Sequence, residues 1–304
     1  DNSLTSFTYS HDSFELGMAS IEASHKMDKG SIFVDLGFGN RAAQFTYNDG
    51  VKTFIIKQLN FTYKFSDKFK VTLGSFATHV GYELVDAVDN KNYSMSYAFT
   101  YGPFFNTGIK VQYTSNKFSF MAGVSNPTDL KSTIDAGSTQ KTFIGQLAFL
   151  GDTGSAYFNV TSGSSNPSSD ENKTQFDFVG KKKLSKAFSL GFNGTYALTT
   201  NDLDSALDGE WFSLVGYVNF IVKESSSVAY RLEYLDAKQA TDRLGLLTGT
   251  SVIGNTLSLN YKVGNLTIIP EFRFDIASED IFTDSNAAPK GLTAYALLAT
   301  TYSF

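Results

Sequence analysis

The sequence predicts an all-β protein, a transmembrane antiparallel up-and-down β-barrel of about 16 strands. Apolar and polar residues alternate with a period of two in segment after segment, as in strands with one apolar and one polar face. The connections between these segments alternate between short and long, as in barrels with tight turns at one end and loops at the other. The last segment, 292–304, alternates up to Phe304, and this ending resembles the C-terminal signature of outer-membrane barrels.

Composition agrees with a chain built from strands. It has 28 Phe and 16 Tyr but only 5 Pro, and proline cannot donate to a ladder. With no Cys, disulfides, thiol nucleophiles and cysteine metal sites are excluded. The net charge is −5 and basic residues form no stripe, so nucleic acid is not a predicted partner. No apolar run approaches the roughly 18 residues of a transmembrane helix. The chain begins at Asp1 without a charged-then-apolar leader, so we expect any signal peptide to have been removed.

Sixteen segments with this alternation follow one another along the chain. In order, they are 4–10, 12–24, 31–39, 53–65, 68–76, 107–114, 117–125, 142–150, 155–162, 174–182, 187–199, 212–222, 227–236, 256–263, 266–276 and 292–304. The first is the weakest. The clearest is 187–199, where Phe188, Leu190 and Phe192 alternate with Ser189 and Asn193. Each is predicted to be about as long as a tilted strand needs to be to cross the hydrocarbon layer.

The connections provide an independent test. The predicted short links are 27–30, 66–67, 115–116, 151–154, 183–186, 223–226 and 264–265. The predicted long links are 40–52, 77–106, 126–141, 163–173, 200–210, 237–255 and 277–291. With one brief first loop they make the fifteen connections that sixteen strands need. The short turns and both termini are predicted to lie in the periplasm.

A barrel of this size encloses water rather than a packed core. On this register the lumen receives Lys64, Lys70, Lys110, Arg231, Lys262, Arg273, Glu15, Asp35, Asp177, Glu233, Glu271 and Asp275. In a dry soluble core such charges would each cost several kcal/mol unless paired. Because bases and acids are equal in number, the wall should have no strong potential, and selectivity should arise at a constriction.

The long connection 77–106 is the predicted constriction. Connections of this length are usually functional. It is rich in aromatic residues, whose exposed surface would be large if it hung freely in water. Folded into the lumen, it would present Glu83, Asp86 and Asp89 to the permeation path. The alternative is that Tyr97, Phe99 and Tyr101 alternate as an ordinary lipid-facing strand, which would change the strand count.

A second charged group is expected on neighbouring strands near the C-terminal end. It contains Arg231, Glu233, Glu271, Arg273 and Asp275. A salt-bridge network that braces the wall is the favoured interpretation, and a ligand site is the alternative. The full set of predicted constriction and pore-lining residues is Glu83, Asp86, Asp89, Lys91, Lys70, Lys110, Arg231, Glu233, Glu271, Arg273 and Asp275.

Several short motifs occur in a fixed order in the N-terminal part. They are VDLGFG at 34–39, LGSF at 73–76, GYE at 81–83, NYSMS at 92–96 and GPFFNTG at 102–108. In this order they resemble the OmpL-like β-barrel porin family of Gram-negative bacteria. The resemblance is specific over residues 1–125 and only a general barrel pattern beyond. It implies an outer-membrane porin, while the substrates of this family are largely undefined.

Catalysis is not predicted. The histidines are His11, His25 and His79, and nothing near them in the sequence completes a catalytic set. No P-loop, dinucleotide fingerprint or metal-ligand spacing occurs, so we predict no cofactor and no metal. Acidic residues at 170–171 and 202–210 lie in predicted external loops, where they are either simply solvated or bind divalent cations and lipopolysaccharide.

The sequence therefore predicts passive diffusion of small hydrophilic solutes through a water-filled barrel in the Gram-negative outer membrane. The bilayer and lipopolysaccharide are the expected surroundings, and a homo-trimer or an envelope complex is left open. The alternative function is a plugged barrel that serves as a structural subunit of an outer-membrane complex. The alternative fold is a soluble β-sandwich or jelly roll, which would show a similar alternation.

Overall fold

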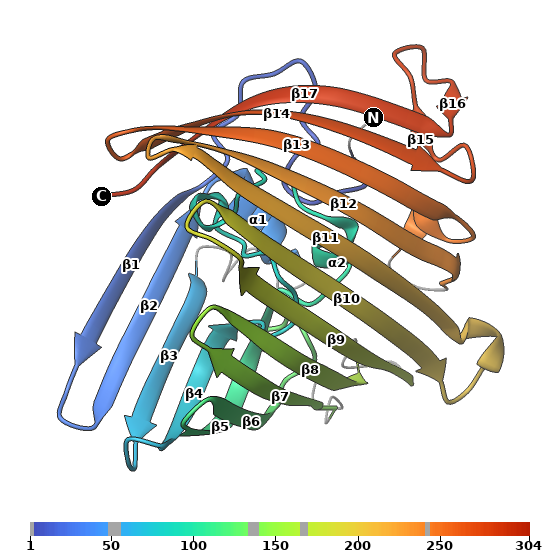
Figure 1. Cartoon of the computed structure of the whole chain (residues 1–304). Coiled ribbons are helices and arrows are strands. Elements are labelled where there is room, and N and C mark those ends of the chain that lie inside the picture. Colours follow the sequence, from blue (N-terminus) through green and yellow to red (C-terminus); the bar gives the residue numbers. More distant parts are fainter. Residues whose placement is uncertain (1–2, 48–55, 133–139, 165–169, 241–243) are drawn as a thin grey trace.

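One continuous antiparallel sheet dominates the protein (Figure 1). The computed structural model describes residues 3–47, 56–132, 140–164, 170–240 and 244–304. Fifteen strands pair in chain order, each with its neighbours in sequence, and curve around a common interior. This arrangement confirms the up-and-down β-barrel and excludes the two-sheet sandwich.

The strand bounds are as follows: β1 (Ala19–Lys26), β2 (Gly30–Phe38), β3 (Ile56–Lys64), β4 (Phe69–Ala77), β5 (Phe105–Ser115), β6 (Phe118–Ser125), β7 (Thr142–Gly151), β8 (Gly154–Ser164), β9 (Glu171–Lys183), β10 (Phe188–Asn201), β11 (Gly209–Lys223), β12 (Ser226–Gln239), β13 (Ser251–Val263), β14 (Leu266–Ala277) and β17 (Leu292–Tyr302). The short strands β15 (Phe282–Thr283) and β16 (Pro289–Lys290) pair with each other. The helices are α1 (Asn40–Phe45), α2 (Tyr97–Thr100) and the 3₁₀ turns η1 (Ala87–Asp89), η2 (Ser205–Leu207) and η3 (Gly245–Leu247).

The register confirms the predicted hairpins. Val263 pairs with Leu266, so Gly264 and Asn265 alone make that turn. Gly264 has φ of 60°, a left-handed conformation that glycine adopts without a steric penalty. Because every strand is antiparallel to its neighbours, the short connections gather at one end of the barrel and the long ones at the other.

The predicted first strand at 4–10 is wrong. Residues 4–7 form turns, and Phe7 has a positive φ of 72°. The Phe7 ring is buried against Phe99 and Phe104, at centroid distances of 6.0 and 5.8 Å. Burial against an interior segment has therefore replaced strand pairing here. The second predicted strand, 12–24, is observed only as β1, from Ala19.

The large sheet accordingly has fifteen strands instead of sixteen. Among the described residues, β1 and β17 are its two edges, and no ladder joins them. β1 precedes a short connection and β17 follows a long one. The start of β1 therefore lies at the long-loop end, and the end of β17 lies at the short-turn end.

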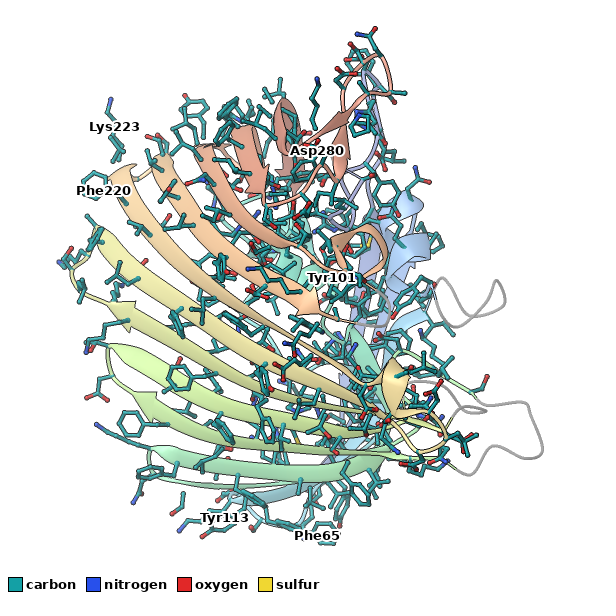
Figure 2. The ribbon with its side chains drawn as sticks, turned by 90° about the vertical axis from the view of Figure 1, so that its right-hand side faces the viewer. Phe65, Tyr101, Tyr113, Phe220, Lys223 and Asp280 are labelled. Atoms are coloured by element: carbon teal, nitrogen blue, oxygen red, sulfur yellow. The ribbon has the colours of Figure 1, made fainter. Side chains whose placement is uncertain are left out.

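The two faces of the wall have opposite chemistry, and the apolar face points outward. On β10, Phe192 is 41% exposed while the adjacent Asn193 is 2% exposed. Phe65, Tyr113 and Phe220 lie close to short connections and are also exposed (Figure 2). Exposed aromatic rings near the end of an apolar wall are typical of the girdle at a membrane interface. The wall is therefore solvated by lipid.

Gly74 tests the packing of the wall. It has φ of 123°, and a Cβ there would lie 2.3 Å from the Leu59 carbonyl oxygen across the β3–β4 ladder. We expect Gly74→Ala to destabilise the barrel by at least about 2 kcal/mol, because both the backbone conformation and the close approach exclude a side chain. Urea unfolding followed by fluorescence of Trp211, the single tryptophan, measures this.

Gly216→Ala is the matched control, because the nearest atom to its added Cβ is the Leu232 carbonyl oxygen at 4.0 Å. Equal unfolding midpoints for the two variants would contradict the account of Gly74.

Candidate functional site

Residues 78–104, between β4 and β5, form a segment that lies on the concave side of the sheet and contains η1 and α2 (Figure 1). We call it the crossing segment, because it contacts three separate parts of the wall. The alternative strand at 97–101 is wrong, since Tyr97–Thr100 is the helix α2. The Ser96 side chain caps this helix by accepting from the Phe99 N–H at 3.1 Å.

The first part of the wall that holds the crossing segment is β8 to β11. A ring nitrogen of His79, Nε2, lies 3.0 Å from the Val160 carbonyl oxygen on β8. The Gly81 N–H donates to Asp177 on β9 at 3.0 Å. Tyr82 stacks on Tyr217 of β11, with ring centroids 4.0 Å apart. Backbone and ring contacts together hold residues 79–82 against this wall.

The second part is β12 to β14, where buried arginines bind the backbone of the crossing segment. Arg231 donates from Nη1 to Glu83 at 2.7 Å and to the Ser94 carbonyl oxygen at 2.5 Å. Arg273 donates from Nη1 to the Met95 carbonyl oxygen at 2.6 Å. Both guanidinium groups are fully buried, so these charge-assisted bonds act away from water.

Carboxylates on the same strands accept hydrogen bonds from backbone N–H groups of the crossing segment. Glu271 accepts from Tyr93 at 2.7 Å and from Ser94 at 2.9 Å. Glu233 accepts from the Tyr97 N–H at 2.7 Å. Arg231, Glu233 and Arg273 thus each have both an ionic partner and a backbone partner, which is the condition under which buried charges are tolerated. Glu271 is held by its two backbone N–H donors and by the Ser258 hydroxyl at 2.5 Å.

Ion pairs connect these groups into one network. Glu233 lies 3.3 Å from Arg231 and 3.0 Å from Arg273. Asp275 lies 2.8 Å from Arg273 and accepts from the Tyr97 hydroxyl at 2.7 Å. Ion pairs join five of the predicted site residues: Glu83, Arg231, Glu233, Arg273 and Asp275. Glu271 is linked to them through the Ser94 backbone, which it and Arg231 both contact. All six side chains are buried.

The third part of the wall is β1 to β3, where Lys57 is fully buried. Its Nζ lies 3.0 Å from Asp35 and 2.6 Å from Asp86 of the crossing segment. Oxygens of Glu22, Asp35 and Asp86 all lie within 4.8 Å of one another, a spacing at which carboxylates can hold a metal ion. Here the Lys57 ammonium supplies the positive charge.

The other predicted site residues are more accessible. Asp89 and Lys91 are exposed on the crossing segment. Lys70 and Lys110 are half-buried on β4 and β5, and the Lys110 ammonium lies 3.8 Å from the centre of the Phe76 ring. These four therefore remain the charged candidates for a permeation path.

Sequence reasoning missed two anchors. Lys57 lies in a predicted strand, but its position beside a carboxylate from residue 86 depends on the path of the crossing segment. Asp129, in the long connection after β6, accepts from the N–H groups of Phe104 and Phe105 at 2.7 and 3.0 Å. No local pattern marks either residue, because their partners come from distant parts of the chain.

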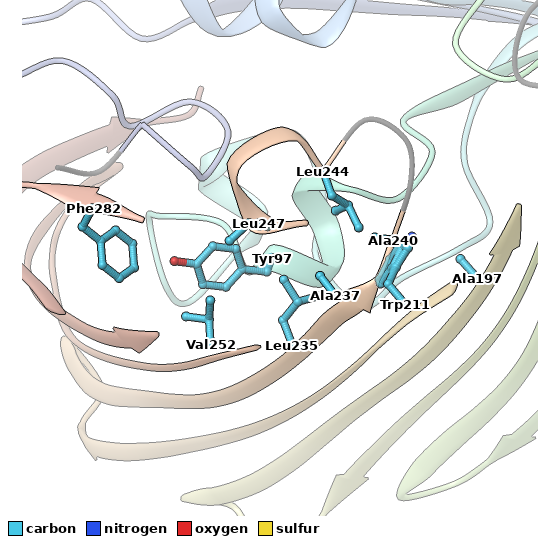
Figure 3. Close-up of a cluster of buried hydrophobic side chains, with 10 residues drawn as sticks. All are labelled: Tyr97, Ala197, Trp211, Leu235, Ala237, Ala240, Leu244, Leu247, Val252 and Phe282. Atoms are coloured by element: carbon cyan, nitrogen blue, oxygen red, sulfur yellow. The ribbon is translucent and has the colours of Figure 1, made fainter. Parts of the chain in front are cut away.

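Hydrophobic packing covers the long-loop end of the crossing segment (Figure 3). The buried cluster there comprises Tyr97, Ala197, Trp211, Leu235, Ala237, Ala240, Leu244, Leu247, Val252 and Phe282. A second cluster joins the N-terminal segment and α1 to the end of the crossing segment, through Phe7, Phe45, Met95, Phe99, Phe104 and Phe105. The crossing segment is thus packed as well as hydrogen-bonded.

The short-turn end is more open. A cavity of about 410 Å³ lies between the connection 184–187 and Tyr82. A second cavity of about 210 Å³ lies beside it, lined by Asn90 and Lys91 of the crossing segment, and both cavities share Asn219 and Ile221. Within the described residues, no helix has the length and apolar character to cross a membrane.

The family model described as "Putative beta-barrel porin-2, OmpL-like" matches residues 1–304, the whole chain. The chain belongs to this porin family. The resemblance seen in the N-terminal motifs is therefore confirmed over the full length. The OmpL-like protein is an outer-membrane porin of the Gram-negative type, and its exposed apolar wall is in contact with the lipid bilayer.

Solved structures share the fold at low sequence identity. OmpT of Vibrio cholerae is 11% identical with a TM-score of 0.60, covering 94% of this chain and 89% of that one. An anion-selective porin from Comamonas acidovorans is 12% identical with a TM-score of 0.61, covering 93% and 85%. The channel DcaP of Acinetobacter baumannii is 10% identical with a TM-score of 0.60, covering 95% and 85%. No curated protein sequence matches the OmpL-like chain.

Arg231 pairs with two carboxylates of the network, Glu83 and Glu233. Arg231→Met would leave Glu83 without its buried cation and Glu233 with Arg273 as its cation, so we expect a loss of about 3–5 kcal/mol in unfolding free energy. The crossing segment should also become sensitive to protease. Arg231→Lys keeps the charge but loses the forked geometry of the guanidinium group. Its unfolding free energy should therefore lie between that of Arg231→Met and that of wild type.

Lys117→Gln is the control for Arg231, since Lys117 forms an exposed pair with Asp152 at 3.5 Å. If Arg231→Met resisted urea and protease as well as Lys117→Gln, the anchoring role would be disproved.

The attachment of Phe104 and Phe105 to the Asp129 carboxyl group should make the stability of this part of the structure depend on pH. Burial raises the pKa of its carboxyl from 3.8 to about 7, although the N–H groups of Phe105 and Phe104 oppose this rise. Because the folded-state pKa is the higher one, the contribution to stability is present at low pH and is lost as pH rises through about 7. Hydrogen exchange at Phe104 and Phe105 should therefore become faster, relative to Asp129→Asn, between about pH 4 and 7 and should show no further relative change above that.

Asp129→Asn keeps an acceptor but cannot ionise. After correction for intrinsic exchange, a constant ratio of the two rates across this pH range would refute the assignment.

Proposed function

We propose that the porin admits small hydrophilic solutes along a path that the crossing segment narrows. The observation that supports this is the attachment of residues 78–104 to three parts of the wall, β1–β3, β8–β11 and β12–β14. A segment fixed to the wall at three places reduces the cross-section of the bore. Its position is maintained by the wall and does not require regular secondary structure of its own. The path would pass the accessible charges of Asp89, Lys91, Lys70 and Lys110.

The proposed orientation follows from the connections. Outer-membrane barrels carry short turns in the periplasm and long loops outside. The end of β17 lies with the short turns, so we assign the C-terminus to the periplasm. A homo-trimer, or a place in an envelope complex, stays a prediction that mass measurement in detergent would test.

The proposed function involves no reaction. His11 and His25 are exposed, and His79 has its Nε2 within hydrogen-bonding distance of a backbone carbonyl oxygen. The buried charged groups around Arg231 and Arg273 are bound to each other and to the backbone, which suits a structural role better than proton transfer.

A plugged barrel is the second candidate, because aromatic clusters pack around the crossing segment at the long-loop end. The two candidates differ in conductance. Purified protein in planar bilayers should give discrete current steps if the path is open, and no steps if the barrel is a structural subunit.

Asp89 tests whether the path passes the crossing segment. Asp89→Asn removes an exposed negative charge from η1, so we expect the cation-to-anion permeability ratio to fall by roughly 1.5- to 2-fold at low salt, where screening is weak. The ratio is obtained from reversal potentials in a KCl gradient.

Asp67→Asn is the control, because Asp67 is exposed in a short turn outside the crossing segment. Glu83→Gln is unsuitable, since its partner is the buried Arg231. If Asp89→Asn and Asp67→Asn gave the same ratio as wild type, the proposed path would be wrong.

A further inference from the structure

The cavity of about 410 Å³ at the short-turn end is lined by charged side chains of one sign only, all of them positive. Its lining contains Lys181, Lys182, Lys183 and Lys186, and it contains no acidic residue. Polar groups without charge complete it, including Ser185, Ser189 and Asn219. A confined space lined by one sign of charge focuses the potential and concentrates ions of the opposite sign.

Two of these lysines lie on the inner face of β9, and a third belongs to the turn that lines the cavity. On β9 the inner face carries Asp177 and Val179, both buried, so Lys181 and Lys183 follow on the same face. Lys186 lies in the connection to β10. Lys182 points the other way, and its Nζ donates to the Thr153 hydroxyl at 2.9 Å. We call Lys181, Lys183 and Lys186 the lysine vestibule.

The floor of the vestibule is built by the crossing segment. The Lys181 ammonium lies 4.6 Å from the centre of the Tyr82 ring, and Tyr82 is stacked on Tyr217. Gly191 makes room for this ring, because a Cβ at residue 191 would lie 2.4 Å from it. Tyr82 is therefore held in place by two wall strands, and the position of Lys181 follows from it.

The charge of the vestibule is uncompensated, unlike that of the deeper cations. Lys57, Arg231 and Arg273 all lie within ion-pair distance of carboxylates. None of the three vestibule lysines forms an ion pair with any described residue. Most interior carboxylates are thus neutralised by these deeper cations. The ammonium groups of the vestibule keep their charge unpaired and can attract an anion.

The adjoining cavity continues the same surface. It is lined by Lys91, Lys223 and Lys262, with Glu224 as its single acid. Asn219 lines both cavities, and its side-chain oxygen is buried without a hydrogen-bond partner in the described structure. An unused acceptor between two groups of ammonium ions suits a solute that carries a hydroxyl as well as negative charge.

We propose that the lysine vestibule is a binding site for small, multiply charged anions, and in particular phosphate-bearing solutes, at the periplasmic mouth of the path. This inference rests on the proposed porin function. Several ammonium groups around one space bind a multivalent anion better than chloride, and lysines that line a pore select anions.

The first test is ion selectivity in planar bilayers of zwitterionic lipid. We expect wild type to prefer chloride over potassium. Lys181→Gln with Lys183→Gln and Lys186→Gln should reduce this preference by at least about twofold at low salt. The matched control replaces Lys29, Lys68 and Lys238 by Gln, which removes the same charge from exposed positions outside both cavities. A cation-selective wild type, or equal effects of the two triple variants, would overturn the proposal.

The second test uses inorganic pyrophosphate added at the short-turn side. Saturable inhibition of the chloride current, lost in the vestibule variant and retained in Lys182→Gln, is the expected result. Dependence on Lys182 instead would assign the phosphate contact to the lipid-facing rim and overturn the proposal.

If wild type gave no current, the porin path itself would have failed. Calorimetric titration of the detergent-solubilised protein with pyrophosphate then decides the site separately. Binding that the vestibule variant loses and the control retains supports the site, and absence of binding to wild type refutes it.

Discussion

The structure depends on one constraint: a wall surrounded by lipid must satisfy its backbone hydrogen bonds laterally and present apolar side chains outward. β10 shows both, because it pairs with β9 and β11 along its length while Phe192 is exposed and Asn193 is buried. Polar groups are thereby directed inward. The interior of this porin is polar and charged because its apolar side chains face the lipid, the reverse of a soluble protein.

An interior lined by charges can hold a segment that a soluble core could not. Residues 78–104 contain few backbone hydrogen bonds of their own, so wall carboxylates and guanidinium groups provide them. Glu271 accepts two backbone N–H groups, and Arg231 donates to a carbonyl oxygen. The buried charges therefore stabilise the position of the crossing segment and are not exposed to passing solutes.

The same pairing determines which charges can act on a solute. Formal counting finds bases and acids balanced on the predicted lumen face, but that balance ignores burial. Once Lys57, Arg231 and Arg273 are matched with carboxylates, the accessible remainder is separated in space. Asp89 remains on the crossing segment, while lysines predominate at the short-turn end. On the proposed path, selectivity would reflect the distribution of unpaired charge rather than the net charge.

The sequence by itself determined the barrel and the alternating order of its seven short and seven long connections between strands. It also singled out the long connection between β4 and β5 as the segment of interest. These features depend on period-two alternation and on turn residues, which are local. Only the tertiary structure decided that residues 4–10 form no strand and that Phe7 packs inward, and that the Glu233 and Arg273 side chains are buried. It also decided that Asp86 meets Lys57. Each of these outcomes depends on contacts between residues far apart in the chain, whose energies no local pattern records.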